Sequence, residues 1–134
     1  MTVYYIKLYF VTLAAFLAID AVWLALVART FYRRYLDWLM AANPNWIAAL
    51  AFYLLFVVGV LVFVVIPGVE DGSLRTTLLK GALFGLIAYG TYDLTNQATV
   101  KNWPLTITAV DMAWGTVLSV AVSYIGFVAG KWLS

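Results

Sequence analysis

Long apolar stretches separated by short polar breaks dominate the sequence. Four such stretches cover about residues 5–28, 46–66, 74–96 and 105–128. Each holds the roughly 20 residues that an α-helix needs to cross a hydrocarbon core about 30 Å thick. The stretches are too long and continuous for the alternating strands of a membrane β-barrel, and a backbone in lipid must satisfy its hydrogen bonds internally. The pattern therefore predicts an all-α bundle of four transmembrane helices in one membrane domain, residues 1–134.

The polar breaks carry their own structural signals. Asn-Pro-Asn at 43–45 and Asn-Trp-Pro at 102–104 are typical of helix starts, and residues 67–73 predict a short turn between the second and third helices. The first break differs, because aromatic residues and leucines recur at three- and four-residue spacing over 31–39, against arginines and an aspartate. This pattern predicts a short amphipathic interfacial helix between helices one and two.

Composition supports a membrane protein and removes several function classes. With 66% hydrophobic and 10% charged residues, the chain has too little polar surface to coat a soluble globule. It has no cysteine and no histidine, so thiol chemistry and the commonest general base and metal ligand are absent. The net charge of +2 is dispersed and gives no basic stripe for nucleic acid. The sequence indicates no catalytic residue and no metal site, and it leaves any cofactor unknown.

Three aspartates, Asp20, Asp93 and Asp111, lie inside the predicted helices. Because the helices alternate in direction, both termini are expected on one side of the membrane and all three carboxylates near the opposite side. At 1.5 Å per residue, Asp20 lies roughly 12 Å and Asp111 roughly 9 Å from that side. An intramembrane acid costs several kcal/mol, so it is a candidate for function or for contacts between helices. Crowded carboxylates cannot all ionise cheaply, and we expect at least one to hold a proton or a cation.

Polar residues also gather around the third aspartate. Tyr89, Asp93 and Asn96 fall on one helical face, which forms a polar stripe that can turn toward the other two acids. An alternative explanation is that the stripe is the interfacial end of this helix and faces headgroups and water.

A short motif occurs in both the first and the fourth helices. Asp20 with Trp23, and Asp111 with Trp114, share the pattern Ala-Ile/Val-Asp-x-x-Trp. In antiparallel helices each indole lies level with the other aspartate, which predicts a reciprocal clasp of N–H groups and carboxylates. The alternative is that the two matches are chance and the tryptophans belong to the aromatic belt. The candidate ligand or ion pocket comprises Asp20, Trp23, Tyr89, Asp93, Asn96, Asp111 and Trp114.

Small residues in the third and fourth helices indicate close packing. Gly81 and Gly85 form one small-xxx-small pair, and Gly115, Ser119 and Ser123 continue the spacing in the fourth helix. We expect these residues to bring two helices together and not to bind a ligand.

Several longer motifs carry a family resemblance. They are Ala-Ile-Asp-Ala-Val-Trp-Leu at 18–24, Tyr-Asp-Leu-Thr-Asn at 92–96, Lys-Asn-Trp-Pro-Leu at 101–105 and Asp-Met-Ala-Trp-Gly at 111–115. Together the chain resembles, over essentially its whole length, a bacterial membrane family catalogued as domain of unknown function 2177. The resemblance implies a four-helix membrane protein, and we expect it in the bacterial inner membrane. It implies no particular reaction.

Three function classes follow from these observations. The favoured one is a small integral membrane protein whose acidic and aromatic pocket binds or translocates a small cation, a proton or a lipid-like ligand. The alternatives are an accessory or structural subunit of a membrane complex and a lipid-modifying membrane enzyme, which would need an aspartate pair or a carboxylate-held metal. The expected partners are the lipid bilayer, a lipid-like or cationic small ligand, and a second copy or a membrane partner, with no nucleic acid.

Overall fold

The computed structural model describes all of residues 1–134 and contains helices and no strands. Two of the helices contain a π-helical turn, labelled η. The elements are α1 (Thr2–Trp23), η1 (Leu24–Ala28), α2 (Arg29–Leu36), α3 (Trp46–Val60), η2 (Leu61–Val65), α4 (Ile66–Asp71), α5 (Leu74–Thr99) and α6 (Leu105–Leu133). Since α1, η1 and α2 are continuous, as are α3, η2 and α4, these six segments form two long helices, and α5 and α6 are the other two. The predicted all-α four-helix architecture is confirmed.

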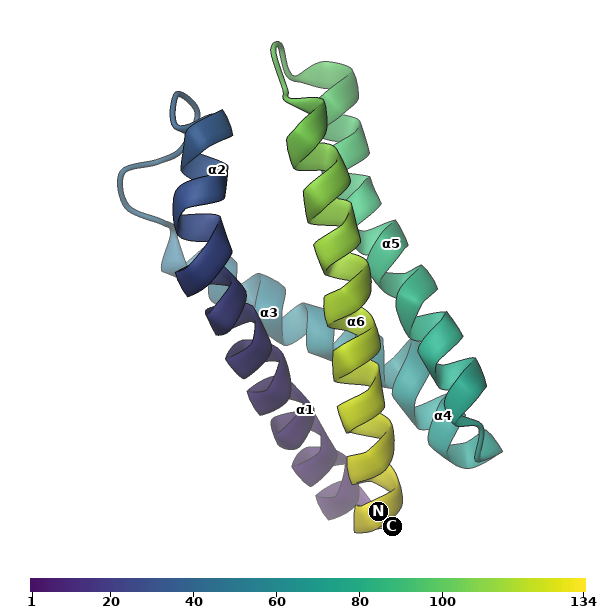
Figure 1. Ribbon diagram of the computed structural model, residues 1–134. Coiled ribbons are helices and arrows are strands. Elements are labelled where there is room, and N and C mark those ends of the chain that lie inside the picture. The colour runs from purple at the N-terminus through teal and green to yellow at the C-terminus, as the bar shows by residue number, and fades with distance from the viewer.

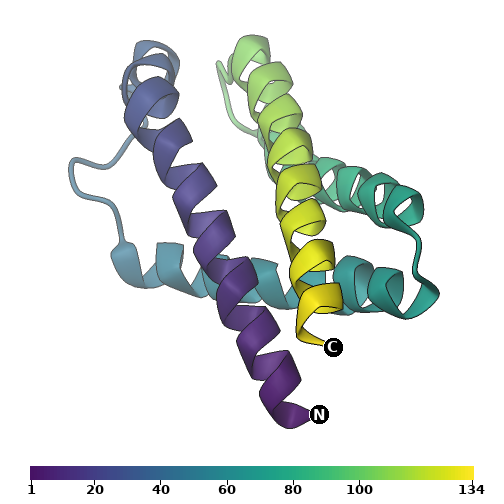
Figure 2. The same ribbon diagram turned by 60° about the horizontal axis from the view of Figure 1, so that its bottom comes forward.

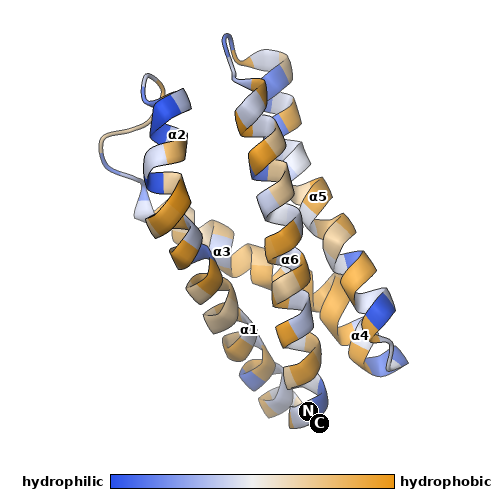
Figure 3. Ribbon diagram, viewed as in Figure 1, coloured by the Kyte–Doolittle hydropathy of each residue, from blue (hydrophilic) through white to orange (hydrophobic).

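Three of the four helices are long and apolar enough to cross a membrane: Thr2–Leu36, Trp46–Asp71 and Leu105–Leu133. The fourth, α5, has 26 residues, which is sufficient length, but it is more polar. Figure 3 shows hydrophilic residues gathered at the ends of the bundle, on α2 and around the turn after α4. The middle of each long helix is predominantly hydrophobic.

Two predicted boundaries are corrected by the structure. The amphipathic segment is helical as expected over Arg29–Leu36, but it continues directly from helix one through η1. The second helix does not end at residue 66, because the expected turn at 67–73 is helical as far as Asp71. Pro67 is tolerated because it follows the π-helical turn Leu61–Val65, where the backbone bonding already departs from the α pattern. Gly72, at φ 67°, then ends the helix.

The expected starts of the other helices follow from local caps. The Asn45 side chain accepts a hydrogen bond from the Ala48 N–H and starts α3. In the same way, Ser73 accepts one from the Thr76 N–H and starts α5. Each cap satisfies one of the first backbone donors, which have no partner within the helix.

The helices are arranged as three roughly aligned rods and one inclined rod. Helices α1 and α6 run side by side in opposite directions, α5 lies along α6, and the α3–α4 helix crosses at a steep inclination (Figures 1 and 2). Both termini lie at the same end of the bundle, where the Tyr4 hydroxyl donates to the Gly130 carbonyl at 2.9 Å. The turn 100–104 and α2 lie at the other end.

Close packing of α5 on α6 confirms the role expected for the small residues. A Cβ atom added at Gly85 would lie 2.4 Å from the Gly115 carbonyl oxygen, and one at Gly81 would lie 2.5 Å from the Ser123 hydroxyl. In lipid, where apolar burial between helices gains little, such contact is a main source of association. The remaining core joins α1, α3, η2 and α6, and comprises Leu8, Phe16, Phe56, Val57, Val60, Leu61, Val65, Leu118 and Val122.

Candidate functional site

A hydrogen bond between α1 and α6 forms one side of the candidate site. The Trp114 indole N–H donates to the Asp20 carboxylate at 3.3 Å, across 94 residues of sequence. Asp20 is 8% exposed, so its carboxylate is held inside the bundle. This is the first half of the predicted clasp, and the structure contains it.

The second half of the predicted clasp is wrong. Asp111 accepts its hydrogen bond from the hydroxyl of Tyr32, on α2, and not from Trp23. Trp23 instead stacks on Trp114, with ring centroids 4.3 Å apart and planes 6° from parallel. The antiparallel geometry thus brings the two indoles face to face, which the predicted clasp did not include. A tyrosine from the neighbouring helical segment therefore replaces the expected indole donor.

Asp20 and Asp111 line one cavity of about 230 Å³. Its walls come from five helical segments and from η1, and no lysine or arginine is among them. The other lining residues are mostly aromatic: Trp23, Leu24, Tyr32, Ala49, Phe52, Tyr53, Tyr89 and Trp114. Two of the predicted acids, both predicted tryptophans and Tyr89 thus meet at a single cavity.

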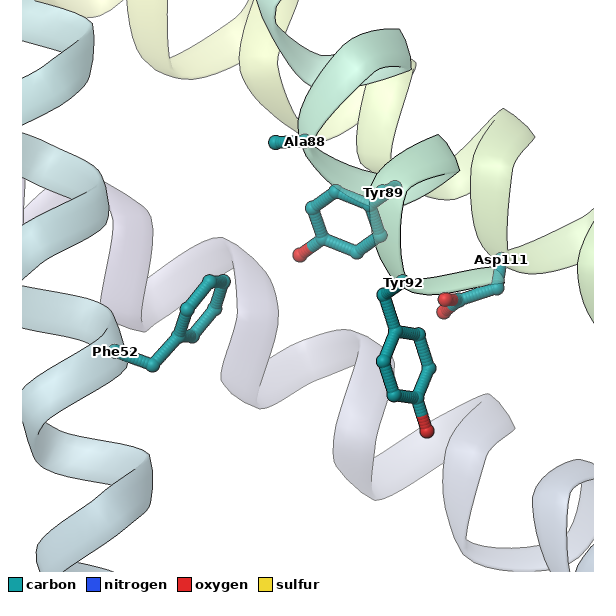
Figure 4. Close-up of a pocket in the computed structure, with 5 residues that line it drawn as sticks. All are labelled: Phe52, Ala88, Tyr89, Tyr92 and Asp111. Atoms are coloured by element: carbon teal, nitrogen blue, oxygen red, sulfur yellow. The ribbon is translucent and has the colours of Figure 1, made fainter. Parts of the chain in front are cut away.

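A second cavity of about 370 Å³ adjoins the first through shared walls. It is lined by Phe52, Ala88, Tyr89, Tyr92 and Asp111 (Figure 4). Figure 4 shows Tyr89 and Tyr92 projecting from α5 between Phe52 on one side and the Asp111 carboxylate on the other.

Glycine at position 115 fixes where the Tyr89 ring lies. The ring packs directly on this residue of α6, since an added Cβ would lie 2.1 Å from the ring carbon Cγ of Tyr89. The close contact between α5 and α6 therefore determines the position of one wall of both cavities.

The other two predicted pocket residues are placed differently. Asp93 is fully buried, and neither carboxylate oxygen has a hydrogen-bond partner, although Asp111 is close enough to interact with it. Asn96 is half-buried. Neither residue lines the two cavities. A role of Asp93 and Asn96 in binding a ligand therefore stays a prediction.

A polar network beside Asp93 holds the turn between α5 and α6. The Trp103 indole donates to the Thr108 hydroxyl at 3.1 Å, and that hydroxyl donates to the Gln97 side-chain oxygen at 2.8 Å. The Gln97 amide donates in turn to the Trp103 carbonyl at 3.0 Å. Asn102 adopts φ 63°, a left-handed conformation that asparagine tolerates better than most residues. The network makes the 100–104 turn a fixed boundary of the site.

Sequence reasoning missed five residues that line the first cavity, of which three are aromatic: Tyr32, Phe52 and Tyr53, together with Leu24 and Ala49. Tyr32 falls in the segment 31–39, where the sequence predicts an amphipathic interfacial helix. It lies nine residues after Trp23, which is 2.5 turns of a regular α-helix, so spacing alone puts the two side chains on opposite sides of the helix, and the π-helical turn η1 between them has no sequence signal. Phe52 and Tyr53 lie in an apolar helix with no polar pattern, and only the inclination of α3 brings them to the acids.

Comparison with known proteins places the chain in a family. The family described as "Predicted membrane protein (DUF2177)" matches residues 5–128. The chain belongs to this family. Searches of curated proteins and of solved structures found no match. Membership of the DUF2177 family, together with the long apolar helices, identifies an integral membrane protein.

The chemistry available at the site is that of carboxylates beside aromatic faces. The three aspartates do not come together as a set of metal ligands. What converges is two buried carboxylates and a group of π faces, with indole and phenol groups as the hydrogen-bond donors to the acids.

Proposed function

We propose that this DUF2177 protein binds the cationic group of a lipid-like small ligand in the cavity that Asp20 and Asp111 line. The observation that carries the proposal is the lining itself, which combines two carboxylates with aromatic rings and contains no basic side chain. Negative charge without a cationic partner inside a low-dielectric region attracts a positive ligand more strongly than it would in water.

An organic cation fits the walls better than a metal ion does. Ammonium groups are attracted to the faces of tryptophan and tyrosine rings, with about 0.5–2 kcal/mol per contact. The stacked pair Trp23 and Trp114 and the rings of Tyr32 and Tyr53 supply such faces beside the acids. A metal ion would need several oxygen ligands converging on one point, and the aspartates do not form such a set.

An accessory role is the second candidate, and one observation favours it. Both acids already accept a hydrogen bond, Asp20 from Trp114 and Asp111 from Tyr32, and these bonds join different helical segments. In that case the carboxylates would stabilise the bundle and a membrane partner or second copy would complete the function. We further propose that the chain resides in a bacterial inner membrane with both termini on one side.

The test is binding of a small probe cation to the whole chain in lipid nanodiscs. Tetramethylammonium is titrated by isothermal titration calorimetry into the wild type and the variants Asp20→Asn and Asp111→Asn. We expect saturable binding that weakens at least about tenfold in each variant, which corresponds to about 1.4 kcal/mol. Glu70→Gln removes an exposed acid from the last turn of α4 and should leave affinity unchanged.

Two results would contradict the proposal. One is absence of saturable binding to the folded wild type. The other is equal affinity of the wild type, Asp20→Asn and Asp111→Asn. Loss of stability in the two aspartate variants without any tetramethylammonium binding would favour the accessory role.

A further inference from the structure

An apolar groove of about 490 Å³ runs between α3 and α5. Its walls are Phe52, Phe56, Phe63 and Phe84, with aliphatic residues of α3 and Gly59 between them. The absence of a side chain at Gly59 gives the Phe84 ring its place, since a Cβ there would lie 2.7 Å from the end of that ring. The groove has no acidic or basic lining residue.

The groove and the acidic cavities share a wall. Phe52 lines all three spaces, so the apolar groove adjoins the two acidic cavities at this side chain. Phe63 lies eleven residues after Phe52 along α3 and η2, a rise of about 16 Å at 1.5 Å per residue. The two spaces together therefore provide a polar end and an elongated apolar end.

The groove opens toward the outside of the bundle. Phe52 is 44% exposed and Phe63 is 66% exposed, and both lie on the helix Trp46–Asp71, which is long and apolar enough to cross a membrane. A ligand chain in the groove would therefore remain in contact with the hydrocarbon of the bilayer and need not cross water to reach the site.

We propose that the ligand is an amphiphile with one ammonium head, seated between Asp20 and Asp111, and one alkyl chain lying in the groove along Phe52, Gly59 and Phe63. This inference rests on the proposed function and names the ligand class. Charge complementarity favours a positively charged head group, because the lining contains two carboxylates and no basic residue. The continuity through Phe52 and the lack of charge in the groove select the chain.

The test uses alkyltrimethylammonium probes of increasing chain length, with tetramethylammonium as the head alone. Binding to nanodiscs that contain the chain is measured against empty nanodiscs of the same lipid, which subtracts partitioning into the bilayer. Val62→Trp fills the groove, and Val117→Trp places the same side chain on α6, outside the cavities described above. Both valines are exposed, at 52% and 60%, so the pair is matched.

We expect Val62→Trp to weaken binding of the dodecyl probe about tenfold and to leave tetramethylammonium binding unchanged, with no effect of Val117→Trp on either. Two results would contradict the proposal that the alkyl chain lies in the groove: equal weakening by both tryptophan variants, or equal affinity for all chain lengths after subtraction. Neither result would contradict binding of the ammonium head between the two aspartates. Failure of tetramethylammonium to bind the wild type would instead overturn the proposed function.

Discussion

Trp114 and Asp20 join α6 to α1 through one hydrogen bond of 3.3 Å inside the bundle. Trp114 also stacks on Trp23, three residues after Asp20. The two motifs of the sequence therefore meet through one indole, which contacts both the acid and the indole of the other helix.

Replacement of Trp114 by phenylalanine should weaken the contact between α1 and α6. The change removes the donor to Asp20 and part of the stacked surface, and hydrogen bonds between membrane helices contribute about 0.6 kcal/mol on average and up to about 1.7. We expect a loss of about 1–2 kcal/mol in the free energy of unfolding, measured in detergent micelles with increasing denaturant. Trp132→Phe, at an 84% exposed position, is the control and should change little. A double-mutant cycle with Asp20→Asn should be non-additive, and simple additivity would contradict a direct interaction.

Replacement of Tyr32 by phenylalanine should loosen α2. The hydroxyl of Tyr32 is the group that bonds α2 to Asp111 on α6. Without it we expect faster hydrogen exchange over Arg29–Leu36, measured by mass spectrometry in nanodiscs. Tyr35→Phe removes a hydroxyl from the same helix that makes no such bond, and it should leave exchange unchanged. Identical exchange in the wild type and Tyr32→Phe would show that the bond does not hold α2.

Alanine at two glycines of α5 should have unequal effects. At Gly85 the new Cβ would meet the Gly115 carbonyl oxygen at 2.4 Å, and backbone cannot move aside easily. At Gly90 the nearest atom is the terminal methyl of Met112 at 3.0 Å, which can turn away. We expect Gly85→Ala to cost about 1–3 kcal/mol in unfolding free energy and Gly90→Ala to cost little. Equal stability of the two variants would contradict a close contact of α5 with α6 that is specific to Gly85.

A protonated carboxyl is expected in the membrane interior, and Asp93 is the residue expected to carry it. Its side chain is fully buried and neither oxygen has a partner, while Asp111 lies close by. A charged carboxylate in that position would cost several kcal/mol. Infrared difference spectra should show a protonated carboxyl stretch at neutral pH in the wild type that Asp93→Asn removes. Asp71→Asn, at the exposed end of α4, should not affect the band. Persistence of the band in Asp93→Asn would assign the proton to another residue.

The fold was predictable because its determinants are local. The length of each apolar stretch indicates a helix, and the caps at Asn45 and Ser73 determine where α3 and α5 begin. The end of the second helix was missed at Pro67, because the π-helical turn that accommodates this proline has no sequence pattern of its own. The prediction of a helix boundary is wrong where the backbone departs from α geometry.

Of the candidate site, only the contacts that follow from the direction of the helices and the depth of each residue were predictable. Antiparallel helices placed Asp20 level with Trp114, and the structure has that contact. Asp111 was assigned the wrong donor because its partner, Tyr32, lies on a segment whose orientation depends on how α2 packs. Asp93 shares the depth of the other acids and lies one turn after Tyr89 on the same face of α5, but it is buried and does not line the cavities. Which polar residues of one helical face reach a cavity is set by packing and cannot be read from spacing alone.

The unbroken helix Thr2–Leu36 has a consequence for the membrane around it. Its 35 residues extend for about 52 Å at 1.5 Å per residue, whereas a bilayer with its headgroups measures about 40–45 Å. The end that carries α2 therefore stands in the headgroup region or beyond it. We therefore expect hydrophobic mismatch to affect the site, because a bilayer of short-chain lipids would bring water closer to Tyr32 and Asp111, and a thick one would surround them with hydrocarbon. Lipid chain length should thus change the strength of the electrostatic attraction between the carboxylates of the cavity and a positive charge.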